Sequence, residues 1–427
     1  LSSAGTASTA STVFDSSQVH EFSVEVDQTD LASMLQTYLS TGNKKWLRAR
    51  VTIDGTAFED AGIKLKGNSS LKGITVDAAP QDLPWRIRLD KYTEGINLDG
   101  FADFTVRSNS TETSLNEAVA LDLLRSSGLA SEDAVASAFS VNGSDAQLRL
   151  VVQNLNEQWV ASNFPYAGSD SVLYKADADG NWDWLGSEGD YSRSFSVEAG
   201  PDDYAPLIRL LDLVNNSSAE RIAAELPDLL DIDAFATYLA FEELIENTDD
   251  IDGPGNNSYL FWDSSTQKFT VVAWDHNLAF GVAMGGANGG PGPGMPDAPG
   301  VDGQPPDGDQ GSGAGAKEPP GMPGALPESL PTNLPPDFPS DIQLGGNGMP
   351  PTNNGIFGNN PLVAVFTENT EWAALKDQAS AELQSSLIDS GVFAASLAQW
   401  SDVVESSGLV AETTITSEAD SIRSVIL

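Results

Sequence analysis

The segment from residue 246 to 281 constrains the fold most strongly, because it joins two apolar runs to a group of acidic and amide side chains. Residues 259–262 and 269–274 form the apolar runs, and the four residues 263–266 between them favour a turn. This pattern predicts a β-hairpin with a longer loop. The second run is apolar on both faces, which is typical of a fully buried strand.

Polar side chains gather at the open end of this predicted hairpin. Asp275 ends the buried strand and Asn277 follows it, while Asp249, Asp250 and Asp252 lie in a Gly- and Pro-broken loop ahead of the first strand. Because a hairpin brings both ends of its strands together, we expect these carboxylates and amides to lie close in space. Hard divalent cations prefer such oxygen ligands.

The composition excludes several classes of function. The chain has 427 residues and a formal net charge of −41, which disfavours binding to nucleic acid or to anionic membrane surfaces. The absence of cysteine excludes disulfides, thiolate catalysis and Cys-ligated zinc. No apolar run has the length of a transmembrane segment.

Small polar residues dominate positions 1–18, which we interpret as a flexible spacer left after export, with the signal sequence absent from this chain. We therefore expect a secreted or extracytoplasmic protein, free or attached to the cell surface.

The pattern of apolar and polar residues divides the rest of the chain into segments for which different structures are predicted. Residues 19–200 contain alternating polar and apolar runs that predict strands, with a few helices. Residues 201–281 are mainly helical ahead of the hairpin, and an apolar helix predicted at 231–247 leads directly into the acidic loop. Gly and Pro dominate residues 282–355, which cannot bury a core and are expected to be disordered. Helical patterns return over residues 356–427.

Four basic residues are concentrated in two predicted strands: Lys64, Lys66, Arg86 and Arg88. Their spacing of two places each pair on one face of its strand, with apolar residues on the other face. One interpretation is an anion site, in which Lys66 and the flexible segment 67–70 bind a phosphate. The other is a solvent-facing sheet surface whose cations pair with neighbouring carboxylates. These residues alone leave both interpretations open.

Five motifs occur in the order seen in the CotH family of spore-coat-protein-H-like secreted kinases, which the chain therefore resembles. They are residues 66–70, 85–88, 172–175, 247–249 with 256–261, and 274–281. The resemblance implies an α+β, atypical two-lobed protein-kinase-like fold. Its mainly antiparallel β lobe would span about 19–200. The helix-rich C-terminal lobe would span about 201–281, completed by 356–427. It also implies transfer of the γ-phosphate of ATP to Ser or Thr of extracytoplasmic or cell-envelope proteins, with Mg²⁺ or Mn²⁺, or Ca²⁺, as the metal.

The resemblance also implies roles for individual residues. Asp249 would orient the attacking hydroxyl, and Lys66 would contact the phosphates as a catalytic residue. Asp275, Asn257 and Asn277 would bind the metal. The nucleotide site would comprise Lys66, Gly67, Asn68, Ser69, Ser70, Arg88 and Lys175. Two positions depart from the family pattern: Gln153 stands where an acidic residue is usual, and Asn277 where a second Asp is common.

These departures keep other functions open. One is a catalytically weak or inactive relative that serves as a CotH-like envelope or adhesion binding protein. Another is an extracellular structural domain whose acidic loops bind Ca²⁺ for stability. The Gly/Pro-rich insert follows Phe280 and Gly281, where protein kinases place their activation segment. It is therefore either a regulatory lid or an expandable surface loop.

Overall fold

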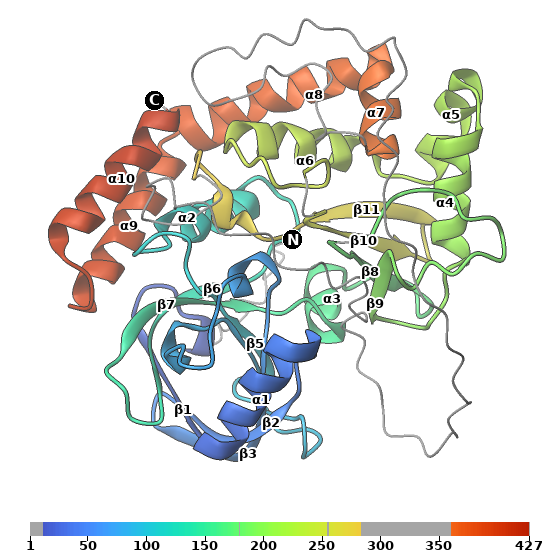
Figure 1. Cartoon of the computed structure of the whole chain (residues 1–427). Coiled ribbons are helices and arrows are strands. Elements are labelled where there is room, and N and C mark those ends of the chain that lie inside the picture. Colours follow the sequence, from blue (N-terminus) through green and yellow to red (C-terminus); the bar gives the residue numbers. More distant parts are fainter. Residues whose placement is uncertain (1–11, 179, 254–255, 283–359, 427) are drawn as a thin grey trace, which may run out of the picture.

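The computed structural model describes residues 12–178, 180–253, 256–282 and 360–426. The predicted spacer lies outside the described residues up to residue 11, and the predicted insert, with its lid hypothesis, lies outside them from residue 283. Within the described part, the chain forms a β-barrel, a second β-sheet and a set of helices that cover the sheet (Figure 1).

Seven strands close into the barrel in the order β1-β2-β3-β4-β5-β7-β6. Neighbouring strands are antiparallel except for β1 and β6, which pair in parallel and close the barrel. Alternate side chains point inward, so that Phe22, Ile63, Ile87 and Phe104 are fully buried in the barrel core. The strands are β1 (His20–Val26), β2 (Leu47–Ile53), β3 (Thr56–Leu65), β4 (Trp85–Arg88), β5 (Asp103–Val106), β6 (Ala134–Val141) and β7 (Gln147–Gln153).

The second sheet has four antiparallel strands in the order β11-β10-β8-β9. The strands are β8 (Val172–Ala176), β9 (Phe195–Ala199), β10 (Ser258–Asp263) and β11 (Lys268–Ala273). The predicted hairpin is confirmed, since β10 and β11 pair from Ser258 opposite Ala273 to Asp263 opposite Lys268. Asn257 directly precedes the first pair of this register and Trp274 directly follows it, so both lie at the open end of the hairpin, with Asp275 next in the chain.

The helices pack mainly on the second sheet and on one side of the barrel (Figure 1). Helix α6 is apolar over most of its circumference because α8 covers one side and β11 the other. The helices are α1 (Gln28–Thr41), α2 (Leu115–Ser126), α3 (Glu157–Asn163), α4 (Ala205–Asn216), α5 (Ala219–Glu225), α6 (Ile232–Leu244), α7 (Pro361–Glu368), α8 (Thr370–Leu383), α9 (Val392–Ser406) and α10 (Glu412–Ile426). None of these described helices is both long enough and apolar enough to cross a membrane.

The α+β class is confirmed, but the predicted two-lobed kinase fold with a helix-rich C-terminal lobe is wrong. The observed architecture is a closed seven-stranded mixed barrel with additional helices. The expected division fails because β10 and β11, assigned to the helical lobe, share one sheet with β8 and β9, assigned to the β lobe. A single apolar core then joins this sheet to helices from both halves of the chain.

Candidate active site

Two cations lie against the same indole ring at the open end of the hairpin. The Nζ atom of Lys66 is 5.5 Å from the centre of the Trp274 ring, and the guanidinium carbon of Arg107 is 4.9 Å from it. Lys66 directly follows β3 and Arg107 directly follows β5, on either side of β4 in the barrel. Trp274 is buried, with its ring edge-on to Tyr259. The barrel and the second sheet therefore meet at this point.

Arg107 joins a buried carboxylate to a more exposed one. Its Nη2 atom lies 2.6 Å from Glu117 Oε1 of α2, and its Nη1 atom lies 3.0 Å from Asp275 Oδ1. The side chain of Glu117 is 2% exposed and that of Asp275 is 28% exposed. Burial opposes the charge of Arg107, but the attraction of Asp275 and Glu117 outweighs it and raises the pKa of the guanidinium. Arg107 is therefore held as a cation.

The backbone at Asp275 is turned sharply and is anchored by its neighbour. Asp275 has φ +68°, a left-handed conformation that is unusual for a non-glycine residue and often marks functional sites. His276 is fully buried, and its Nε2 atom lies 3.2 Å from Glu242 Oε1 of α6. Burial alone would lower the pKa of His276, but the attraction of Glu242 raises it to about 9. The His276–Glu242 ion pair thus ties the segment after Asp275 to α6.

The other two predicted metal ligands are Asn277, two residues after Asp275, and Asn257, at the same end of the hairpin. The side-chain amide of Asn277 donates to Ser110 Oγ at 3.0 Å, and its backbone carbonyl accepts from Asn116 Nδ2 at 2.7 Å. Asn257 directly precedes β10, and its backbone N–H donates to Asp250 O at 3.1 Å. In the part of the chain that the structure describes, no group of three or more His, Asp or Glu residues is placed to hold a metal.

This donor set fits Mg²⁺ better than it fits a cation that needs a complete protein cage. It offers one carboxylate, Asp275, with the amide oxygens of Asn257 and Asn277. Mg²⁺ commonly binds through one or two carboxylates and the phosphates of a substrate, and it keeps several waters. Ca²⁺ takes six to eight oxygen ligands, so this set is less suited to it.

The acidic loop after α6 contains three aspartates in different surroundings. Asp249 is partly buried, and its backbone N–H donates to Asn247 Oδ1 at 3.4 Å. Burial, with added repulsion from Glu242, raises the pKa of Asp250 to about 7. Asp252 accepts a hydrogen bond from the backbone N–H of Asn360 at 2.9 Å, just before α7. Asp252 therefore connects this loop to the C-terminal helices.

The predicted phosphate loop follows Lys66 directly. Gly67 has φ +90°, and a Cβ atom at this position would lie 2.1 Å from Ser70 Oγ, so the tight turn requires glycine. Asn68 accepts from Lys44 Nζ at 2.8 Å, and Ser69 begins a short 3-10 helix, Ser69–Leu71. The loop is thus compact and lies beside the cation at Trp274.

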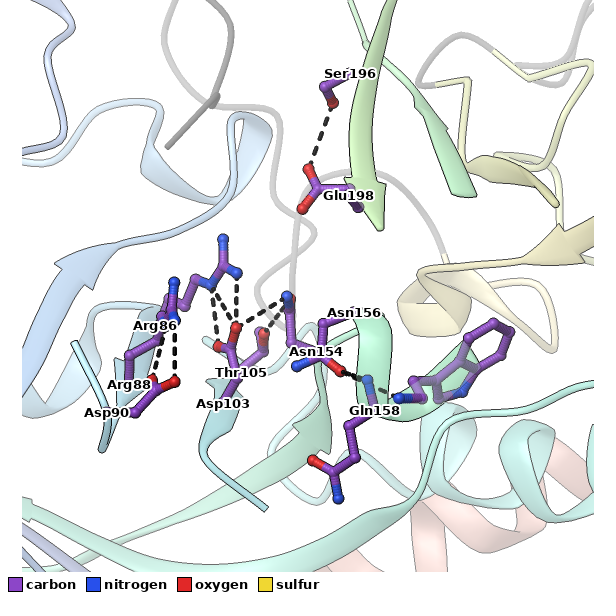
Figure 2. A network of polar contacts seen from close by, with 11 residues as sticks. Arg86, Arg88, Asp90, Asp103, Thr105, Asn154, Asn156, Gln158, Ser196 and Glu198 are labelled. Atoms are coloured by element: carbon purple, nitrogen blue, oxygen red, sulfur yellow. Dashed lines mark hydrogen bonds and ion pairs between the residues drawn. The ribbon is translucent and has the colours of Figure 1, made fainter. Parts of the chain in front are cut away.

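The two arginines of the basic patch are engaged by carboxylates (Figure 2). Arg86 forms a bidentate ion pair with Asp103, and Asp103 also accepts from Asn154 at 3.4 Å. Arg88, a predicted nucleotide ligand, is paired with Asp90 at 3.0 Å. Arg86 and Arg88 therefore pair with neighbouring carboxylates, as the second interpretation expects, but the Arg86–Asp103 pair is largely buried and does not face solvent.

Lys175, the other predicted nucleotide ligand, lies on β8 of the second sheet. It stands between Tyr259 of β10 and Ser196 of β9 in the sheet register, and its Nζ atom donates to its neighbour Ala176 O at 3.1 Å. Figure 2 shows Ser196 and Glu198 of β9 across from the Arg86 and Asp103 group of the barrel. Lys175 thus belongs to the sheet that faces the barrel.

Sequence reasoning missed the buried ionic residues around Asp275, namely Arg107, Glu117, Glu132, Glu242 and His276. A signal was present for Glu117, because it lies in the first turn of a helix whose neighbouring residues are buried. No local pattern marks Glu132, which is fully buried and has no hydrogen-bond partner for its carboxyl oxygens among the described residues. Burial raises the pKa of Glu132 to about 7, against the attraction of His276.

The chain matches the family described as CotH kinase protein over residues 63–313, which is more than half of its length. It therefore belongs to the CotH kinase protein family, as the resemblance of its motifs predicted. No curated protein matches the chain. Family membership indicates a kinase-like function.

Proposed function

We propose that this protein is a secreted protein kinase that transfers the γ-phosphate of ATP to Ser or Thr of extracytoplasmic or cell-envelope proteins. The observation that carries the proposal is the placement of Lys66 and Arg107 against Trp274, with Asp275 beside them. Phosphoryl transfer depends mainly on positioning and on neutralising phosphate charge. In this site Lys66 supplies a cation for the phosphates, and Arg107 holds Asp275 in place.

Each part of the site has a separate role in this proposal. Lys66 and the compact loop 67–70 bind the phosphates, and Lys175 on the facing sheet is a second nucleotide contact. Asp249 accepts the proton of the attacking hydroxyl as the new bond from oxygen to phosphorus forms and ADP leaves. Asp275, Asn257 and Asn277 would hold Mg²⁺ or Mn²⁺. Such an ion, when bound, neutralises charge on the phosphates.

Phosphate transfer from labelled ATP tests the proposal. The full chain is incubated with ATP labelled in the γ-phosphate and with Mg²⁺ or Mn²⁺, and phosphorylated Ser and Thr are identified by mass spectrometry in the protein itself and in added envelope proteins. Asp249→Asn and Lys66→Met should each abolish transfer, whereas Lys72→Met, an exposed lysine in the next loop, should leave it intact. Absence of transfer by the unaltered protein would refute the proposal.

A second candidate is a CotH-like envelope or adhesion binding protein without turnover. It is favoured by the single carboxylate of the metal set and by its ion pair with Arg107, which competes with a metal for Asp275. The same experiment separates the two functions. An inactive binding protein would be stabilised by ATP and metal, yet it would transfer no phosphate.

A further inference from the structure

Glu117, Arg107 and Asp275 form a row that runs from the protein interior toward the surface. Glu117 lies on α2 and is buried, Arg107 contacts both carboxylates, and Asp275 is the partly exposed end. Arg107 also covers Trp274, so its position is fixed from three directions. Glu117 itself lies within the buried side of α2 and contacts Asp275 only through Arg107 in these ion pairs.

The charges of this row determine how strongly Asp275 can attract a cation. Burial raises the pKa of Glu117, and the attraction of Arg107 opposes that shift. With both carboxylates ionised, the guanidinium and the two carboxylates give a net charge of −1. If Glu117 were neutral, Arg107 would cancel the charge of Asp275, and a divalent ion would meet a neutral pair. Charges a few ångströms apart at a partly buried site interact strongly, so this difference is large enough to change metal affinity.

Among the neighbouring buried carboxylates, Glu132 also attracts Arg107, but its carboxyl oxygens have no hydrogen-bond partner among the described residues, whereas Glu117 lies 2.6 Å from the guanidinium. His276 is paired with Glu242, which balances its charge locally. Gln153, at the position where the family resemblance leads one to expect an acid, is buried and carries no charge; its Oε1 atom lies 3.5 Å from the backbone N–H of Asp133. The buried carboxylate that reaches Arg107 therefore comes from α2 instead of β7.

We infer that Glu117 is a positioning residue that sets the affinity of Asp275 for the divalent ion, by holding Arg107 and balancing its charge. This inference rests on the proposed function, because it assumes that Asp275 binds the metal of a phosphate-transfer site. It assigns opposite effects to the two partners: Glu117 favours metal binding, and Arg107 opposes it. A purely structural role would give effects of the same sign.

Titration with Mn²⁺ in the presence of ADP, followed by electron paramagnetic resonance, tests the inference on the full chain. Because the chain has a net charge of −41, weak background binding is expected, and the relevant site is the one lost in Asp275→Asn. Glu117→Gln keeps the shape of the side chain and should weaken Mn²⁺ binding at that site by about tenfold or more. Glu117→Asp, which retains the charge, should restore most of the affinity, and Arg107→Gln should tighten binding.

Asp103→Asn is the matched control, because it disturbs the buried Arg86 ion pair in the same barrel. It should leave the Mn²⁺ affinity unchanged, and thermal melting of every variant establishes that it is folded. Unchanged affinity in Glu117→Gln, or equal weakening in Glu117→Gln and Arg107→Gln, would overturn the inference while the proposed function stands. If the unaltered protein bound neither Mn²⁺ nor ADP, the proposed function would fail and the inference with it.

Discussion

Replacing the buried Glu132 with glutamine should stabilise the protein at alkaline pH and have little effect at acid pH. Glu132 has no exposed surface, and burial raises its pKa from 4.5 to about 7. The charged groups near it are His276 and Arg107, which favour the anion, and Glu117, which disfavours it. At a pH between these two pKa values, the carboxyl of Glu132 is protonated in the folded protein but ionised in the unfolded chain. The stability contributed by this group is therefore fully present below pH 4.5 and is lost as the pH rises through 7.

The size of the effect follows from the change in pKa. At about 1.4 kcal/mol for each tenfold change in proton affinity, a move from 4.5 to about 7 corresponds to about 3 kcal/mol. Glutamine resembles the protonated acid, so Glu132→Gln should raise the free energy of unfolding by about that amount at pH 8. Below pH 4.5 the variant and the unaltered protein should differ little.

Urea denaturation at several pH values between 4.5 and 8, followed by tryptophan fluorescence, measures this difference. Titration of groups common to both proteins largely cancels when the two curves are subtracted. Glu157→Gln on the exposed side of α3 is the control, and it should change stability by no more than about 0.5 kcal/mol at each pH. A difference between Glu132→Gln and the unaltered protein that is constant over this pH range would refute the reasoning.

Three further predictions concern stability, each measured by thermal or urea denaturation. Arg86→Gln leaves Asp103 buried without its bidentate partner and should cost about 3–5 kcal/mol; a loss under 1 kcal/mol would contradict this. Gly200→Ala should cost about 2 kcal/mol, because φ is +88° and the new Cβ atom would lie 2.1 Å from Ser171 O. Asp27→Ala removes the cap that accepts from the backbone N–H groups of Thr29 and Asp30, and should lower the free energy of unfolding. Retained stability in either variant would count against the corresponding contact.

Local patterns predicted the elements whose signal lies within a few residues. The hairpin formed by β10 and β11 follows from its two apolar runs and intervening turn, and α6 follows from its apolar surface. The spacing of two in β3 and β4 also held, since Lys64 pairs with Arg86 and Ile63 with Ile87 in the register. Each of these features is fixed by side-chain direction within one element and by its immediate neighbours.

The sequence by itself determined the hairpin, the acidic group at its end, the lysine and glycine loop at 66–70, and the CotH family of the chain. Only the tertiary structure decided that the strands close into a barrel, because closure depends on the parallel pairing of β1 with β6, more than a hundred residues apart. The same holds for the ion pairs of Arg107 with Glu117 and Asp275. These three residues come from different elements, and burial makes their charges depend on one another. The spacing of these residues along the chain gives no sign that their charges interact.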